Sequence, residues 1–190
     1  MKYAFTKAEL NVPISWTAEV DSVHDYLEQS SGEYVYKTIT LSANNTSASV
    51  NIFQLTGTVE VMQIFGSIAT KTTLANLTAW YFDLYDSTAS VPLTKNDGVL
   101  SAMAVGTIFY KNAAASVTMA IGNNAAWAME EAATGVKAFM PFMITQKTWA
   151  NTYIRFNYTT TDAPINATLR ISVRYRPHTA GWVKGTLIAV

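Results

Sequence analysis

Apolar and polar residues alternate with a period of two along most of the chain after residue 33. The first such segment, residues 34–43, places one set of side chains on each face of an extended strand. The two sets are Val35, Ile39 and Leu41, and Tyr34, Tyr36, Thr38 and Thr40. This alternation predicts a half-buried β-strand at the start of the regular part of the chain.

Residues 51–70 are more apolar, and Glu60 is the only charged residue among them. Gly57 is expected to separate two strands within this stretch. In the second strand the pattern predicts one face with Val59, Val61 and Phe65 and an opposite face with Glu60, Met62 and Ile64. Because alternation weakens after Glu60, we expect the strand to run from a half-exposed end into an interior covered on both sides.

About ten β segments follow one another at short spacing, with turn residues between them. The later ones are residues 77–86, 100–110, 116–122, 136–145, 151–160, 167–177 and 182–190. This spacing predicts an all-β fold, an antiparallel β-sandwich of jelly-roll or Greek-key type. Pro141 points to an edge position or a bulge. Residues 125–135 fit either a short helix or a strand.

Residues 1–47 differ from residues 48–190 and are predicted to form an N-terminal arm, a short helix and the first strand, ahead of the jelly-roll sandwich. Thr17 is a candidate helix cap and Gly32 a candidate stop. Between them, Val20, Val23 and Leu27 recur at helical spacing. Glu19, Asp21, Asp25 and Glu28 make this stretch acidic. The whole chain is still expected to form one compact domain, because its length suits a single core.

Composition limits the classes of partner. Only 14% of the residues are charged and the formal net charge is zero, against a globular average of about 25% charged residues. Such a surface favours self-association, and it lacks the basic excess that nucleic-acid binding requires. The chain has no cysteine, no apolar run long enough for a membrane helix and no N-terminal secretory signal. We therefore expect no nucleic-acid or membrane partner.

Candidate catalytic groups are sparse. The two histidines are His24, in the acidic segment, and His178, in an expected turn between the last two strands. Asp83 and Asp86 are three residues apart on a strand, which places them on opposite faces. No phosphate-binding glycine motif is present. The sequence predicts no enzyme, no catalytic residue, no cofactor and no metal site.

All four arginines of the chain lie between residues 155 and 176. On one strand, Arg170, Arg174 and Arg176 share a face, and Arg155 precedes them. One interpretation is a solvated outer face of a sandwich strand. The other is a basic row that contacts an acidic partner, because guanidinium groups bind carboxylates in a bidentate manner. That partner could be the acidic segment of the same or a neighbouring subunit, which contains Glu19, Asp21, Asp25 and Glu28. These eight residues are the candidate subunit or capsid contacts.

Residues 48–190 resemble small jelly-roll virion proteins of tailed bacteriophages, including capsid decoration (cement) proteins. The resemblance is carried by the F-x-x-T-G-T-V-x-V strand pair at 53–61, the A-V-G-T segment at 104–107 and the closing R-Y-R-P at 174–177. It implies a homotrimer that binds the major capsid protein and reinforces the shell. It supplies no functional residue that can be transferred by position.

The leading hypothesis is therefore a structural virion protein, made in the cytoplasm of the bacterial host and located on the capsid surface. The alternative is a receptor- or carbohydrate-binding head of a phage tail or fibre that uses exposed Trp and Tyr. A glycan-processing enzyme on the same fold is a third hypothesis.

Overall fold

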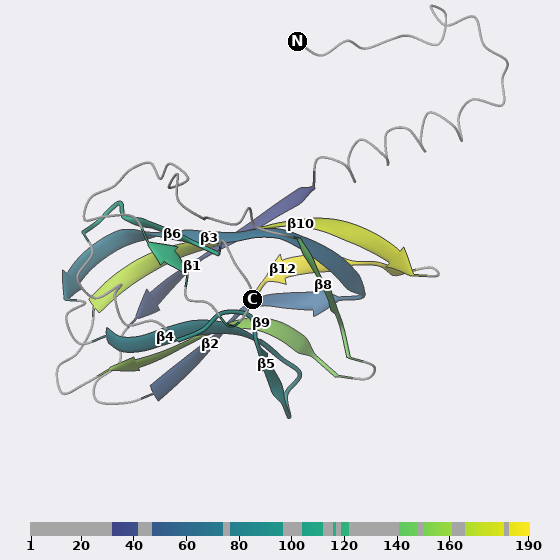
Figure 1. Ribbon diagram of the computed structural model, residues 1–190, viewed down its shortest axis with the longest axis horizontal. Helices are drawn as coiled ribbons and strands as arrows, with labels where there is room; N and C mark the ends of the chain where they lie inside the picture. Colours follow the sequence, from purple (N-terminus) through teal and green to yellow (C-terminus); the bar gives the residue numbers. More distant parts are fainter. Residues whose placement is uncertain are drawn as a thin grey trace, which may run out of the picture.

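Extended strands make up the regular structure of the protein, which we describe from a computed structural model (Figure 1). The described residues are 32–41, 47–73, 77–96, 104–111, 116, 119–121, 141–147, 150–160, 166–180 and 183–190. They contain no helix, and all their strand pairs are antiparallel. The predicted all-β antiparallel fold is confirmed. The helix expected after Thr17 and the ambiguous residues 125–135 lie outside the described residues.

The strands form two layers. Sheet A has the order β1 (Glu33–Leu41), β10 (Asn166–Ala180), β3 (Thr58–Thr73), β6 (Ile108–Tyr110) and β7 (Ala120–Ile121). Two short strands extend it, β8 (Phe142–Thr145) beside β3 and β11 (Val183–Lys184) beside β10. Sheet B has the order β12 (Thr186–Ala189), β2 (Ser47–Thr56), β9 (Thr152–Thr160), β4 (Leu77–Tyr85) and β5 (Ser90–Pro92).

Early strands pair with late strands in both layers. β1 pairs with β10 from Glu33 opposite Tyr175 to Leu41 opposite Ala167, and β2 pairs with β9. Because β1 and β2 follow one another but lie in different sheets, the chain crosses between the layers. The first strand therefore belongs to the same sheet as strands from the middle and the end of the chain.

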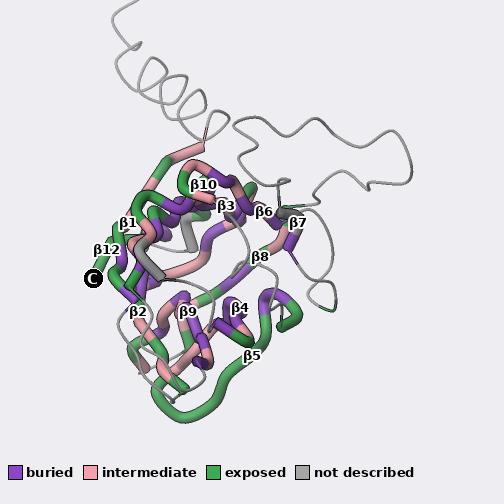
Figure 2. The backbone as a smooth tube through the Cα atoms, turned by 90° about the vertical axis from the view of Figure 1, so that its left-hand side faces the viewer, coloured by how far each residue is buried: buried purple, intermediate pink, exposed green. Residues whose placement is uncertain are grey.

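The hydrophobic core lies between the two sheets, where buried residues alternate with exposed ones along the strands (Figure 2). Its centre is aromatic. Trp80 of sheet B meets Phe109 of sheet A edge to face, with ring centroids 5.2 Å apart. Phe82 and Phe156 pack beside them, again with centroids 5.2 Å apart. Each such ring pair contributes about 0.5–1.5 kcal/mol beyond the burial of its surface. The Trp80–Phe109 pair joins the two sheets, whereas the Phe82–Phe156 pair lies within sheet B.

The two faces predicted for β1 are confirmed. Ile39 and Leu41 are buried and Val35 is half-buried, while Tyr34 and Tyr36 are exposed. Lys37 points toward the same side as the apolar residues, but at the sheet edge, where its ammonium group donates to the carbonyl oxygen of Asn51 at 2.9 Å and to that of Val190. These bonds join the edge of sheet A to the edge of sheet B, and partial burial lowers the pKa of Lys37.

In β3 the predicted arrangement of the two faces is wrong. Tyr175 lies opposite Val61 and Arg174 lies opposite Gln63, so Met62 is an extra residue in β3. This β-bulge reverses the phase of the strand. Ile64 is therefore fully buried with Val59 and Val61, whereas Phe65 turns to the outer face. The weakened alternation after Glu60 comes from the bulge and not from cover on both sides.

The turn predictions have mixed outcomes. Gly57 separates β2 from β3 with a φ of 66°, as predicted. Pro141 immediately precedes β8, whose pairing in the described residues is with one end of β3, which agrees with an edge position. His178 was predicted in a turn but lies within β10, opposite Thr58 of β3. The hairpin that follows β10 begins later, because β10 continues to Ala180.

We predict that deletion of Met62 leaves the fold intact, because residues 58–68 of β3 then alternate regularly. Deletion of Ile64 should instead destabilise the fold, because when the strand becomes regular Gln63 takes the buried position of Ile64 opposite Val173, and a polar side chain replaces an apolar one in the core. Thermal unfolding followed by circular dichroism measures both. A chain without Met62 that unfolds as readily as the chain without Ile64 would contradict the bulge.

Candidate functional site

Strand β10 presents arginine side chains on the outer face of sheet A. Arg170 and Arg174 are exposed and Arg176 is half-buried. The alternate residues Leu169, Ile171, Val173 and Tyr175 are buried in the core. The shared face predicted for Arg170, Arg174 and Arg176 is therefore confirmed.

The register of the sheet gives these arginines different neighbours on β3. Arg176 lies opposite Glu60 and Arg170 lies opposite Ser67. Arg176 Nη1 donates to Glu60 Oε2 at 2.7 Å. Among the described residues no carboxylate pairs with Arg170 in this way; its guanidinium carbon instead lies 4.3 Å from the centre of the Tyr36 ring. This is a cation–π contact, in which the ring face attracts the cation and orients it.

Aromatic side chains surround Arg170 on the same face. Tyr34 donates its hydroxyl to Ser172 Oγ at 2.8 Å, and its ring centre lies 6.0 Å from that of Phe65. Tyr34 and Tyr36 are each 52% exposed although both are large and partly apolar. We refer to Tyr34, Tyr36, Phe65, Arg170 and Ser172 together as the aromatic–arginine face.

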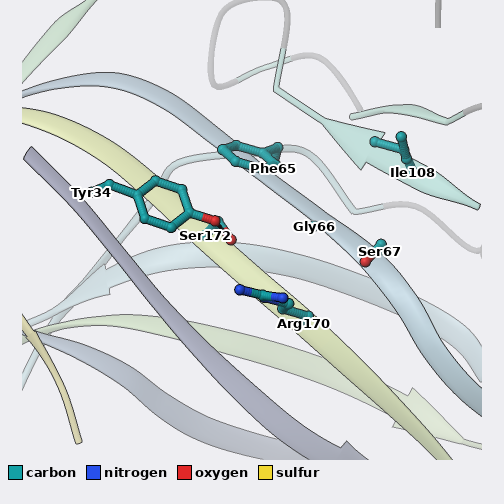
Figure 3. Close-up of a pocket in the computed structure, with 7 residues that line it drawn as sticks. All are labelled: Tyr34, Phe65, Gly66, Ser67, Ile108, Arg170 and Ser172. Atoms are coloured by element: carbon teal, nitrogen blue, oxygen red, sulfur yellow. Dashed lines mark hydrogen bonds between the residues drawn. The ribbon is translucent and has the colours of Figure 1, made fainter. Parts of the chain in front are cut away.

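A hollow of about 300 Å³ lies on this face (Figure 3). It is lined by Tyr34, Phe65, Gly66, Ser67, Ile108, Arg170 and Ser172. These residues come from β1, β3, β6 and β10, so the hollow exists only when strands from both ends of the chain pair. It combines aromatic carbon, hydroxyl groups and one guanidinium, and can therefore accept a ligand that has both an apolar part and an anionic or hydroxyl group.

Glu33 holds one end of β1 against β10 and β11. Its carboxylate accepts a hydrogen bond from the Tyr175 hydroxyl and a salt bridge from Lys184 Nζ at 2.9 Å. Partial burial opposes the charged form, but the bonds from Tyr175 and Lys184 outweigh it and lower the pKa of Glu33. Burial, together with the nearby Glu33 charge, raises the pKa of Tyr175 to about 12.

Arg155 does not belong to the arginine row. It lies on β9 of sheet B, the opposite layer, where its Nε and Nη2 donate to Asp83 at 3.0 and 2.6 Å. Its guanidinium carbon lies 3.8 Å from the centre of the Tyr85 ring. The Asp83 carboxylate raises the pKa of Arg155, and Asp83 itself is 1% exposed. This pair is a structural contact between β9 and β4.

Sequence reasoning and the structure agree on only part of the candidate set. Glu19, Asp21, Asp25, Glu28 and His24 lie outside the described residues. Phe65 was missed as an outer-face residue because the bulge at Met62 leaves no local signal. The alternation in residues 34–43 had already placed Tyr34 and Tyr36 together, and that was the available signal for the aromatic part of the face.

Groups suited to catalysis or metal binding are not gathered in the described part of the chain. It contains no cluster of three or more His, Asp or Glu residues that could hold a metal ion. Asp83 is paired with Arg155, and Asp86 binds Lys147 and the backbone of the turn at Thr88 and Ala89. The two aspartates therefore serve separate structural contacts. No helix within these residues has the length and apolarity needed to cross a bilayer.

Comparison with known proteins gives no assignment: no family model, no curated protein and no solved structure matches the chain.

We predict that Asp83→Ala lowers the free energy of unfolding by about 3 kcal/mol, because it leaves the Arg155 charge without its partner in a largely buried position. Glu60→Ala is the control, since the Arg176 pair is more exposed and should contribute about 1 kcal/mol or less. Chemical denaturation measures both. Equal effects would contradict the distinction between a buried structural pair and a surface pair.

We predict that Glu33→Gln weakens the acid sensitivity of the fold. The folded state lowers the pKa of Glu33, so its charged form stabilises the protein above the unfolded pKa, and that stabilisation is lost as pH falls below about 4.3. The natural chain should therefore lose more stability between pH 6 and pH 3 than the variant. Denaturation at a series of pH values measures the two slopes, and parallel slopes would contradict the prediction.

Proposed function

We propose that the chain is a structural virion protein of a tailed phage, of the decoration (cement) type, which binds and stabilises the capsid shell as a homo-oligomer. The aromatic–arginine face is the observation that carries this proposal. Tyr and Arg dominate the residues whose truncation costs most at protein interfaces, and Tyr34 and Tyr36 are exposed here beside Arg170. Such a face suits a protein partner.

The strand order supports the jelly-roll part of the proposal. Sheet A contains β1, β10, β3 and β6 in sequence across the layer, and sheet B contains β2, β9, β4 and β5. The pairing is nested, because β1 pairs with β10 and β2 pairs with β9. A jelly roll has this pairing, since it is a long antiparallel hairpin rolled into two sheets. Jelly rolls of eight strands are common in viral capsid and lectin domains.

The proposed partners are the major capsid protein and further copies of this chain, in a homotrimer at the capsid surface. The zero net charge supports this, because copies of such a protein repel one another little. The resemblance of residues 48–190 to phage virion proteins supports the same role. The chain would act by binding, without catalysis, and without contact to nucleic acid or membrane.

The hollow favours a second candidate function, a receptor- or carbohydrate-binding head of a phage tail or fibre. Aromatic faces bind the apolar side of a sugar ring, and the hydroxyl groups of Ser67 and Ser172 line the same space. A head of this kind would be present in few copies per virion and would bind glycans, whereas a decoration protein would be present in many copies and would bind isolated capsids.

We predict that Tyr36→Ser lowers affinity for capsids of the encoding phage at least tenfold, because it removes an exposed aromatic side chain and the support of Arg170. Val91→Ser is the matched control: Val91 is 62% exposed, but it lies on β5 of the opposite sheet. Sedimentation of protein with purified expanded capsids measures both affinities. Absence of capsid binding by the natural chain, together with binding to a glycan array, would replace the proposal by the second candidate.

A further inference from the structure

On the outer face of sheet A, Arg176 pairs with a carboxylate, whereas none of the carboxylates in the described part of the chain forms an ion pair with Arg170. Along β10, Arg176 and Arg170 point the same way, and each has a cross-strand neighbour on β3. For Arg176 that neighbour is Glu60, which forms the salt bridge. For Arg170 it is Ser67, whose side chain is short and uncharged. Ser67 and Arg170 both line the hollow. A longer acidic side chain at position 67 could reach the guanidinium there, as Glu60 reaches Arg176.

Arg170 is held ready to bind such a group. The cation–π contact with Tyr36 restrains the guanidinium, so less side-chain freedom is lost when a carboxylate binds. The rest of the hollow is lined by apolar side chains, among them Phe65 and Ile108, and by hydroxyl groups. A carboxylate carried on a peptide with apolar neighbours fits this lining, because the carboxylate can pair with Arg170 while the apolar side chains cover the aromatic rings.

The carboxylates of the described residues are already committed to partners. Glu33 pairs with Lys184, Glu60 with Arg176, Asp83 with Arg155 and Asp86 with Lys147. If another copy of this chain supplies the acidic group, it must therefore come from outside the described residues.

Residues 17–31 have the required chemistry. They contain Glu19, Asp21, Asp25 and Glu28, and no lysine or arginine. Val20, Val23 and Leu27 supply apolar side chains among these carboxylates. Gly32 follows the segment directly, and a Cβ atom added to it would lie 3.5 Å from Arg174 Nε. The segment is therefore joined to the rest of the chain at the border of the arginine row.

We propose that residues 17–31 of one copy bind the aromatic–arginine face of a second copy, with a carboxylate of the segment paired with Arg170 in the hollow. An acidic segment and a basic face on the same chain are the two halves of a heterologous contact, and repetition of such a contact closes into a ring when the rotation allows. The proposal rests on the homo-oligomer of the proposed function and names the surfaces that form it.

Cysteine cross-linking in the full chain tests the proposal, since the natural chain contains no cysteine. Four chains carry one substitution each, Glu19→Cys, Asp21→Cys, Asp25→Cys or Glu28→Cys. Each is co-expressed with a chain that carries Ser67→Cys. A disulfide forms only where the two Cα atoms come within about 7 Å, so mild oxidation should give a covalent dimer of one chain of each kind for at least one position. Ser90→Cys, on the exposed β5 of sheet B, replaces Ser67→Cys as the control and should give none.

The other outcomes overturn the proposal. Failure of all four positions to link with Ser67→Cys would show that the segment does not reach the hollow. When both cysteines are placed in one chain, a link found by mass spectrometry only within that chain would show that the segment folds back on its own copy. An acidic oligosaccharide that protects the Ser67→Cys thiol from an alkylating reagent, when no cross-link forms, would assign the hollow to a glycan instead.

Native mass spectrometry gives a second measurement that does not depend on cysteine. Arg170→Glu should weaken the oligomer at least tenfold, and Lys95→Glu, a charge reversal at an exposed position beyond β5, should leave it unchanged. Reversal of the segment charges to lysine in the Arg170→Glu chain should restore the oligomer. Unchanged assembly of Arg170→Glu would contradict the proposed contact, whatever the outcome with capsids. Absence of capsid binding with a normal oligomer would contradict only the proposed function.

Discussion

The pairing of β10 with β1 on one side and with β3 on the other is the constraint on which both the core and the outer face depend. Leu169, Ile171 and Val173 are fully buried, so their packing between the sheets fixes the register of β10. Once that register is fixed, Arg170 and Arg174 must point outward, because successive side chains of a strand alternate between faces. A slip of one residue would exchange buried leucine and isoleucine for arginine, at a cost that the core cannot offset.

The alternation of apolar and polar residues was sufficient to predict the two faces of strands that contain no bulge. The faces of β1 and of β10 follow directly from alternation, and Gly57 marked the break between β2 and β3. The pattern failed in β3 because a bulge depends on the partner strand, and Met62 carries no residue-type signal for one. The position of Phe65, and with it one wall of the hollow, could therefore not be read from the sequence alone.

The candidate site shows a second limit of sequence reasoning. Arg155 is close in sequence to the other arginines but lies in the opposite sheet, because membership of a sheet depends on long-range pairing. There Asp83 faces it across the β9–β4 pair, and the two charges neutralise each other at a nearly buried position. Arg170 has Tyr36 and Ser67 nearby instead. Arg155 thus holds two strands together in one layer, whereas Arg170 contacts an aromatic ring on the outer face of the other, and cross-strand neighbours decide between these arrangements.

Along β10, residues that pack in the core alternate with residues on the outer face of the sheet. The buried residues of β10 contribute to the core, whereas substitution at Arg170 removes only an exposed side chain and its contact with Tyr36. The face is also braced before any partner binds, by the bond from Tyr34 to Ser172 and by the bond from Tyr175 to Glu33. Because these contacts join strands from opposite ends of the chain, an isolated peptide of β1 or β10 would lack the face. A partner that binds this face would therefore bind only the folded sandwich. It would contact side chains that folding has already ordered, so little further conformational entropy would be lost on binding.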